Sequence, residues 1–204
     1  RKTWIGGNIG TPLISELARM QRGDLVVQEL SSFQLELWDR SPQVAAVTNI
    51  TPNHLDRHRT MAAYVDAKAN IVRHQTAADT AVLAADDPGA MSLIGEVRGR
   101  LRTFSLEHGV LDGSCIVDNQ VVIRDGSRET AVCHIHDVRL RGNHNLLNVL
   151  AAVALADSVG ITPQAMRSAI LEFTGVAHRL EIVATLSGVT YVNADGQTVS
   201  ATLG

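Results

Sequence analysis

The chain has 204 residues, of which 45% are hydrophobic and 19% charged, and its formal net charge at pH 7 is -3. This size and composition predict one large globular domain, or one domain with a short extension, and exclude a disordered chain. The basic residues are scattered, which argues against nucleic acid or an anionic membrane surface as a partner. No apolar run is long enough for a transmembrane helix. With only two cysteines, Cys115 and Cys133, the chain is expected to be cytoplasmic with reduced thiols.

Strand-like and helix-like segments alternate over the first half of the chain. The expected order is a helix after residue 11, strands at 25–30 and 43–50, a helix at 61–75, a strand at 80–85, a helix from 86–88 and a strand at 100–104. The positions expected to face inward on the 61–75 helix are Ala62, Val65, Ala69 and Val72. This alternation predicts an α/β fold with a doubly wound, mostly parallel sheet and helices on both faces.

The pattern changes in the second half of the chain. Between residues 113 and 140, short alternating runs are separated by the turn formers Asp118-Asn119 and Asp125-Gly126, which predicts a small antiparallel β meander. Helices are expected at 145–159 and 162–173, the second with a Thr-Pro start. Two strands at 181–186 and 189–193 would then form a hairpin-like pair.

The segment 25–30 has the length and branched side chains of a buried strand, and it contains a carboxylate, Glu29, near its end, followed by small polar residues. In open α/β sheets, ligands bind just outside the carboxyl ends of strands, so Glu29 would lie at an active-site edge. A simpler interpretation is a capping loop, in which Ser31 and Ser32 satisfy the free N–H groups of a helix running through Leu35 and Leu37.

Five stretches in order carry a resemblance that spans nearly the whole chain. They are GGNIG at 6–10, ELSSFQLE at 29–36, NITPNHLD at 49–56, GNHNLLN at 142–148 and FTGVAHR at 173–179. Together they resemble the Mur ligases, the ATP-dependent amide ligases of peptidoglycan synthesis. Within that family the match favours the members that join D-glutamate to UDP-N-acetylmuramoyl-L-alanine.

The resemblance implies that the substrate carboxylate accepts the γ-phosphoryl group of ATP and that the amine of D-glutamate then displaces phosphate. Magnesium ions and cations would neutralise the charge. By the resemblance, Glu29, His54 and Lys68 hold the metal, and His54 and Lys68 belong to the catalytic centre, with Lys68 carbamylated to an anionic oxygen ligand. The simpler alternatives are a histidine that caps the next helix and a solvated surface lysine.

The same resemblance implies two sets of substrate contacts. Those near the muramoyl substrate are Asn8, Ser31 and Gln34, and those near the nucleotide are Asn145, Asn148 and Arg179. Amide groups can both donate to and accept from an adenine edge, and an arginine fork suits phosphates. As alternatives, these residues are a turn asparagine, helix-start residues, a cap and an exposed polar side chain.

The chain also departs from the family pattern. It contains no GxxGK[ST] phosphate-binding loop, and at the expected ribose-binding aspartate it has Ala194, with Asp195 one position later. We therefore expect residues 1–186 to form a central domain without its phosphate loop, and 187–204 to run toward a further domain. The chain alone is expected to be inactive.

Two other functions are compatible with parts of the sequence. Another amide ligase, such as a different Mur ligase or a folylpolyglutamate-type ligase, would share the chemistry, although the SSFQLE portion argues against it. A non-catalytic nucleotide-sugar-binding module would share the fold without the reaction. A zinc site at Cys133, His134 and His136 is a weaker alternative, because alternation along a strand explains that spacing equally well.

Overall fold

The computed structural model describes residues 1–8, 12–52, 58–140, 142–175, 179–186, 189–194 and 197–201, with the backbone alone from 179 onward. The chain divides into two compact units. One comprises Arg1–Ala81 with Asp87–Leu101, and the other Val82–Asp86 with Arg102–Gly204.

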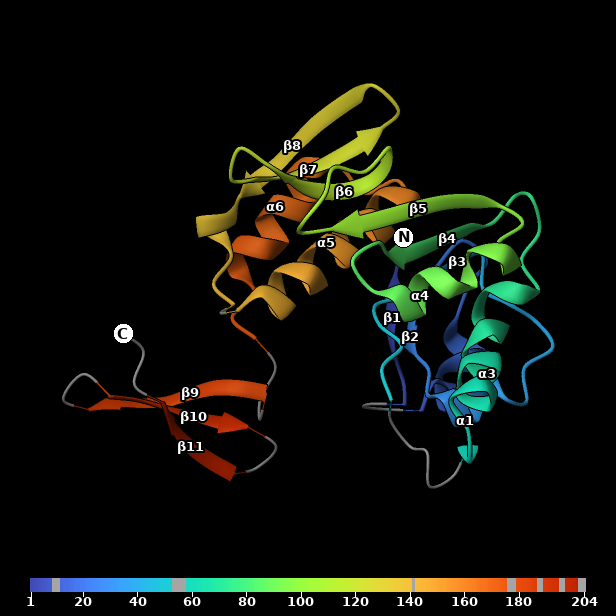
Figure 1. Ribbon diagram of the computed structural model, residues 1–204, viewed down its shortest axis with the longest axis horizontal. Coiled ribbons are helices and arrows are strands. Elements are labelled where there is room, and N and C mark those ends of the chain that lie inside the picture. Colours follow the sequence, from blue (N-terminus) through green and yellow to red (C-terminus); the bar gives the residue numbers. More distant parts are fainter. Residues whose placement is uncertain are drawn as a thin grey trace. The chain divides into compact units, whose positions relative to one another are not determined.

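The first unit begins with a parallel pair of strands, β1 (Thr3–Gly7) and β2 (Leu25–Glu29), separated by the 3₁₀ helix η1 (Leu13–Arg19). The two strands run side by side in Figure 1. The predicted strand is confirmed, but its expected burial is wrong. Val26 and Val27 are 49% and 53% exposed, because β2 pairs with β1 alone among the described residues and no described element covers it.

Three further helices belong to this unit: α1 (Ser32–Leu35), α3 (Met61–Arg73) and α4 (Pro88–Met91), the last followed by η2 (Ser92–Glu96). Helix α3 packs against α1 and β3 (Val44–Val47). It buries Tyr64, Ala67, Ala69 and Val72, whereas Ala62 is exposed. The inward positions were therefore only partly predicted, since Ala69 and Val72 are buried but Val65 is half-buried.

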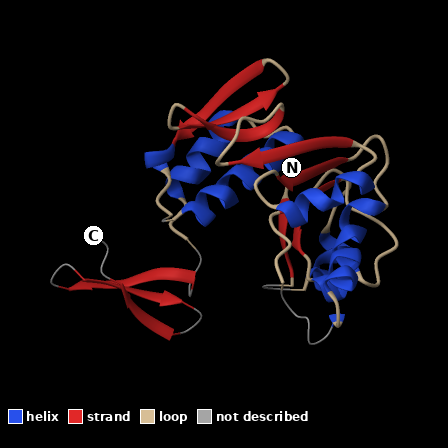
Figure 2. Cartoon of the chain, viewed as in Figure 1, coloured by secondary structure: helices blue, strands red, loops and turns tan. Residues whose placement is uncertain are grey.

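Six strands hydrogen-bond in the order β3-β4-β5-β6-β7-β8, where β4 is Thr80–Ala84 and β5 is Arg100–Ser105. Strand β6 (Asp112–Val117) is parallel to β5, and β7 (Gln120–Asp125) and β8 (Arg128–His134) add the antiparallel meander. The α/β class with parallel strands and a small antiparallel extension is thus confirmed, as Figure 2 shows by its red strands and blue helices.

Two helices cover the meander within the second unit. Helix α5 (Asn143–Ser158) contacts β6 and β7, and α6 (Pro163–Glu172) contacts β8, as seen in Figure 1. Leu150 and Val153 of α5 are almost completely buried, as are Cys115 and Val121 of the meander. No helix in the described ranges is both long and apolar enough to cross a membrane.

The C-terminal backbone forms a separate antiparallel sheet of β9 (Arg179–Leu186), β10 (Val189–Ala194) and β11 (Gln197–Ala201). The expected pair at 181–186 and 189–193 is confirmed, and β11 was not predicted. Ala194 ends β10, and Asp195 lies outside the described residues.

Candidate functional site

The carboxyl end of the β1–β2 pair brings two of the predicted site residues together. Gly7 lies opposite Glu29 in the strand register, and the backbone N–H of Asn8 donates to the carbonyl of Glu29 at 2.8 Å. Both side chains are exposed at this edge. Two distant motifs, GGNIG and ELSSFQLE, therefore meet at the end of the sheet where an α/β fold places its ligands.

The backbone of Gly7 explains why the chain can pass so close to Glu29. Gly7 has φ +121°, and a Cβ atom built there would meet the backbone oxygen of Glu29 and, at 2.9 Å, its nitrogen. Only glycine lacks the atom that would collide. The second glycine of GGNIG is thus required by the spacing between the two strands.

We expect Gly7→Ala to destabilise the chain by about 1–3 kcal/mol and to move Glu29 away from Asn8, because strain and collision act together. Hydrogen exchange at the Asn8 amide, which would become faster, measures the displacement. Gly23→Ala is the matched control, since Gly23 also has a positive φ, +99°, but no atom within 4 Å of the added Cβ. Equal effects of the two substitutions would contradict the close approach of β1 to β2.

Ser31 and Gln34 also meet, but they do so in a helix cap. The Ser31 Oγ accepts from the Gln34 backbone N–H at 3.3 Å, and the Gln34 Oε1 accepts from the Ser31 N–H at 2.9 Å. This reciprocal capping box confirms the capping role considered for Ser31. Ser32 does not cap the helix as expected, because its hydroxyl contacts His58 instead. The helix ends at Leu35 and does not reach Leu37.

Lys68 lies half-buried on α3, with its Nζ 5.3 Å from the centre of the Tyr64 ring. Burial lowers the pKa of Lys68, and the charge of Asp87 partly opposes this by raising it. Asp87 itself accepts from the backbone N–H of Ile50, beyond the end of β3, and from Ala90 at the start of α4. Lys68 is therefore not the fully solvated lysine of the simpler alternative, and its pKa responds to the charge of Asp87, a residue that the sequence indicated only as a helix start.

Of the three predicted metal ligands, only Glu29 and Lys68 lie within the described residues. No hydrogen bond or ion pair joins Glu29 to Lys68 among the described residues. His54 lies in the segment 53–57, outside the described residues, so its place relative to the other two remains a prediction.

The predicted adenine contacts stand at the start of α5 in the second unit. Asn145 and Asn148 are three residues apart on this helix, half-buried and exposed respectively. The cap of the helix is Gly142, whose φ is +90°, so the alternative role of Asn145 as a cap is wrong. Arg179 begins β9, and its side chain lies outside what the structure describes.

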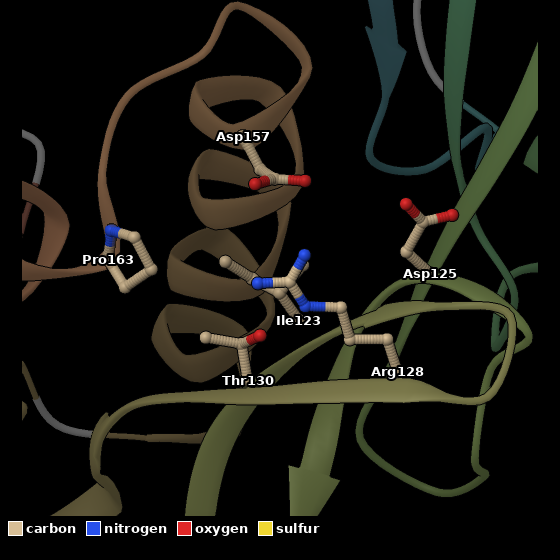
Figure 3. A pocket seen from close by; sticks show the side chains of 6 residues that line it. All are labelled: Ile123, Asp125, Arg128, Thr130, Asp157 and Pro163. Carbon is tan, nitrogen blue, oxygen red and sulfur yellow. The ribbon is translucent and has the colours of Figure 1, made fainter.

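Other groups of polar side chains in the described ranges were not predicted as site residues. Asp86, Glu107 and His108 bring possible ligand atoms within 4.8 Å of one another. His134 is occupied in a local turn, accepting at Nδ1 from the His136 N–H, and no metal cluster of described residues includes Cys133. A pocket of about 160 Å³ is lined by Ile123, Asp125, Arg128, Thr130, Asp157 and Pro163 (Figure 3), none of which was predicted as a site residue.

Most of the chain matches a known protein family. Residues 5–156 match the model of the Mur ligase middle domain. The chain is 46% identical over 195 residues to the UDP-N-acetylmuramoylalanine--D-glutamate ligase of Symbiobacterium thermophilum, covering 95% of this chain and 43% of that protein. For the ligase of the same name from Acetivibrio thermocellus, the identity is 42%, over 94% of this chain and 41% of the relative. The chain thus spans less than half the length of these relatives.

Solved structures show the same fold at lower identity. A MurF ligase from Thermotoga maritima in complex with ADP has a TM-score of 0.64 and 20% identity, covering 95% of this chain and 47% of that one. A MurF structure from Acinetobacter baumannii gives a TM-score of 0.62 and 17% identity, covering 96% and 50%. The family match includes the strand end at which Asn8 meets Glu29 and the helix that carries Lys68, and the chain therefore belongs to the Mur ligase family.

Proposed function

We propose that this chain is part of an ATP-dependent ligase that joins D-glutamate to UDP-N-acetylmuramoyl-L-alanine in peptidoglycan synthesis. The observation that supports this most strongly is its 46% identity, over 95% of its length, to a relative named for that reaction. The reaction would take place in the cytoplasm, with ATP and the UDP-linked precursor as substrates. The substrate carboxylate is phosphorylated, and the amine of D-glutamate then attacks the acyl phosphate with release of phosphate.

The described residues fit magnesium at the β1–β2 edge. Glu29 presents an exposed carboxylate there, which is the ligand type that a hard divalent cation prefers. When bound, the metal would neutralise charge on the phosphoryl group during transfer. We assign Glu29, His54 and Lys68 to hold it, and Asn8 to orient the muramoyl substrate beside Glu29. Ser31 and Gln34 keep the start of α1 fixed through their mutual cap while offering polar atoms to the same substrate.

Lys68 is assigned as the carbamylated ligand because of its half-buried position. A lysine must lose its proton before its amine can attack carbon dioxide, and the lowered pKa increases the neutral fraction at any given pH. The attack forms an N–C bond and releases one proton, which turns a cation into an anionic oxygen donor. Asn145, Asn148 and Arg179 are assigned to the adenine and phosphates of ATP.

The proposal is tested with a reconstituted ligase, defined as this chain joined to the flanking segments of the Symbiobacterium thermophilum relative. It should release phosphate only when ATP, UDP-N-acetylmuramoyl-L-alanine and D-glutamate are all present. Replacing D-glutamate by L-glutamate is the control for the amine substrate. Absence of phosphate release from a folded reconstituted ligase would overturn the proposed function.

The isolated chain is expected to fold but not to turn over ATP, because it contains no glycine-rich loop that could cradle the phosphates. The same phosphate assay, applied to the purified chain of 204 residues, checks this. Steady phosphate release that depends on both the UDP-linked substrate and D-glutamate would show that the expectation is wrong.

A further inference from the structure

A buried histidine joins both ends of the short helix α1. The Nε2 atom of His58 lies 2.8 Å from the hydroxyl of Ser32, and its Nδ1 lies 2.9 Å from a carboxylate oxygen of Glu36. The His58 side chain is 1% exposed. Its ring stacks on Phe33 with the centres 5.0 Å apart, and the Tyr64 ring lies 5.2 Å away on α3. One imidazole thus contacts two residues of α1, the residue that caps its C-terminal end, and one residue of α3.

The two polar contacts of His58 are of different kinds. A carboxylate can only accept, so Glu36 beside Nδ1 favours the tautomer with its proton there, which leaves Nε2 to accept from the Ser32 hydroxyl. The contact with Glu36 has the distance of an ion pair but not the alignment of a hydrogen bond. The Ser32 contact is therefore the directional one, and Glu36 selects the tautomer that makes it possible.

The backbone next to His58 is held in an uncommon conformation. Arg59 has φ +62°, and the N–H of Thr60 donates to the carbonyl of His58 at 2.7 Å, which closes a three-residue turn. Thr60 is then the cap of α3, accepting from the Ala63 N–H at 3.2 Å. A non-glycine residue with positive φ persists where its surroundings determine its position. Here the buried ring on one side and the cap of α3 on the other provide that constraint.

A nucleophilic role for Ser32 does not fit this arrangement, although serine, histidine and glutamate resemble a catalytic triad. Ser32 is 5% exposed, and its hydroxyl is already engaged by the buried ring. A substrate carbonyl would have no access to it.

The arrangement instead fixes α1 relative to α3. Ser31, the cap of α1, and Gln34 lie close to Ser32 in the chain, and on α3 the Tyr64 ring is near both the His58 ring and the ammonium group of Lys68.

We propose that His58 is a positioning residue for ligation, which fixes α1 relative to the start of α3 so that Ser31, Gln34 and Lys68 keep the geometry that the muramoyl substrate and magnesium require. This inference rests on the proposed function. His58 touches no reacting group itself and acts through Ser32 on one side and Tyr64 on the other. It also fixes the chain at four residues beyond His54, the proposed metal ligand.

The test uses the reconstituted ligase with His58→Ala, His58→Gln and His58→Asn. The longer glutamine side chain places its amide toward Ser32, as Nε2 does, whereas the shorter asparagine side chain reaches only toward Glu36. We expect His58→Ala to raise two quantities by about tenfold or more: the KM for UDP-N-acetylmuramoyl-L-alanine and the magnesium concentration that gives half activity. The KM for ATP should change by less than about twofold. His58→Gln should recover most of this loss, and His58→Asn little of it. His74→Ala, at the exposed histidine that ends α3, should change none of these values.

A second measurement does not depend on activity. In the purified chain, His58→Ala should increase hydrogen exchange at the Gln34 and Ala63 amides, which lie in the first turns of α1 and α3, and leave the fully buried Val72 protected. If the KM for ATP rises as much as the other two quantities, or if kcat falls with the melting temperature while every KM is unchanged, His58 is merely a core residue and the proposal is overturned. Unchanged exchange at Gln34 and Ala63 also overturns it. A parent ligase that is inactive while these amides do respond would instead refute the proposed function.

Discussion

Lys68→Ala is expected to abolish ligation by the reconstituted ligase, with a loss of at least about 1000-fold, because an anionic oxygen ligand is missing from the metal site. Short-chain acids such as acetate should partly restore activity by supplying that oxygen. The position of Lys68 supports this expectation: it is half-buried on α3, and burial lowers its pKa, which favours the neutral amine that reacts with carbon dioxide. The measurement is product formation at fixed magnesium, with and without added acid.

The chain offers a direct control for this prediction, because Lys2 is its only other lysine. Lys2 lies over the Trp4 ring, 3.5 Å from its centre, and Lys2→Ala should retain activity without acid. With ¹³C-labelled bicarbonate, the purified chain should give a carbamate carbon signal that disappears in Lys68→Ala and persists in Lys2→Ala. Near-parental activity of Lys68→Ala without acid would remove Lys68 from the metal site, while the family assignment would stand.

The strand end at Glu29 was predictable from the sequence because an apolar run that stops at a carboxylate has a physical meaning in an α/β fold. The structure adds that Asn8 is hydrogen-bonded to the backbone of that residue. The exposure of β2 was not predictable, because a pattern of apolar residues indicates what a strand could bury and not which neighbours it has. Val26 and Val27 are typical of a buried strand in composition, yet β1 is their only described partner in the sheet.

The role of His58 could not be predicted, because its partners lie far away in sequence. Ser32 precedes it by 26 residues, and no periodicity relates the two positions. Ser32 was expected to cap α1 because serine at a helix start usually does so. In the structure Ser31 alone caps the helix, which leaves the Ser32 hydroxyl for the histidine. Local patterns therefore predicted the helix start correctly. They did not predict that one serine caps the helix while its neighbour makes a tertiary contact.

The burial of Arg102 could not be predicted from the sequence either. A strand was predicted at 100–104, and an arginine in its middle would ordinarily point to solvent. Instead the Arg102 side chain is 1% exposed. Its Nε donates to Asp112 at 2.8 Å, and its Nη1 donates to the Ala154 carbonyl and the Ser158 hydroxyl at the end of α5. Its partners come from positions far along the chain, so the strand pattern alone could not reveal them.

The second large effect is expected for Arg102→Met, which should lower the free energy of unfolding by about 3–5 kcal/mol. The substitution keeps the apolar volume of the side chain but leaves the Asp112 and Asp157 carboxylates without their shared cation. The Nη2 of Arg102 lies 2.7 Å from Asp157, in an ion pair that lacks hydrogen-bond alignment. The substitution also removes a positive charge near the C-terminal end of α5, where the helix dipole favours a cation. Urea unfolding of the purified chain, followed by circular dichroism, measures the loss.

Arg139→Met is the matched control, because Arg139 is exposed and its replacement should change stability by less than about 0.5 kcal/mol. The triple variant Arg102→Met with Asp112→Asn and Asp157→Asn should recover part of the loss, since it removes the two carboxylate charges together with the charge of the arginine. The free energy of unfolding of Arg102→Lys should lie between those of the parent and Arg102→Met. Lysine keeps the positive charge, but its single ammonium group cannot contact β6 and two turns of α5 at once, as the planar guanidinium group does. A loss below about 1 kcal/mol for Arg102→Met would mean that the buried arginine contributes little to the stability of the second unit.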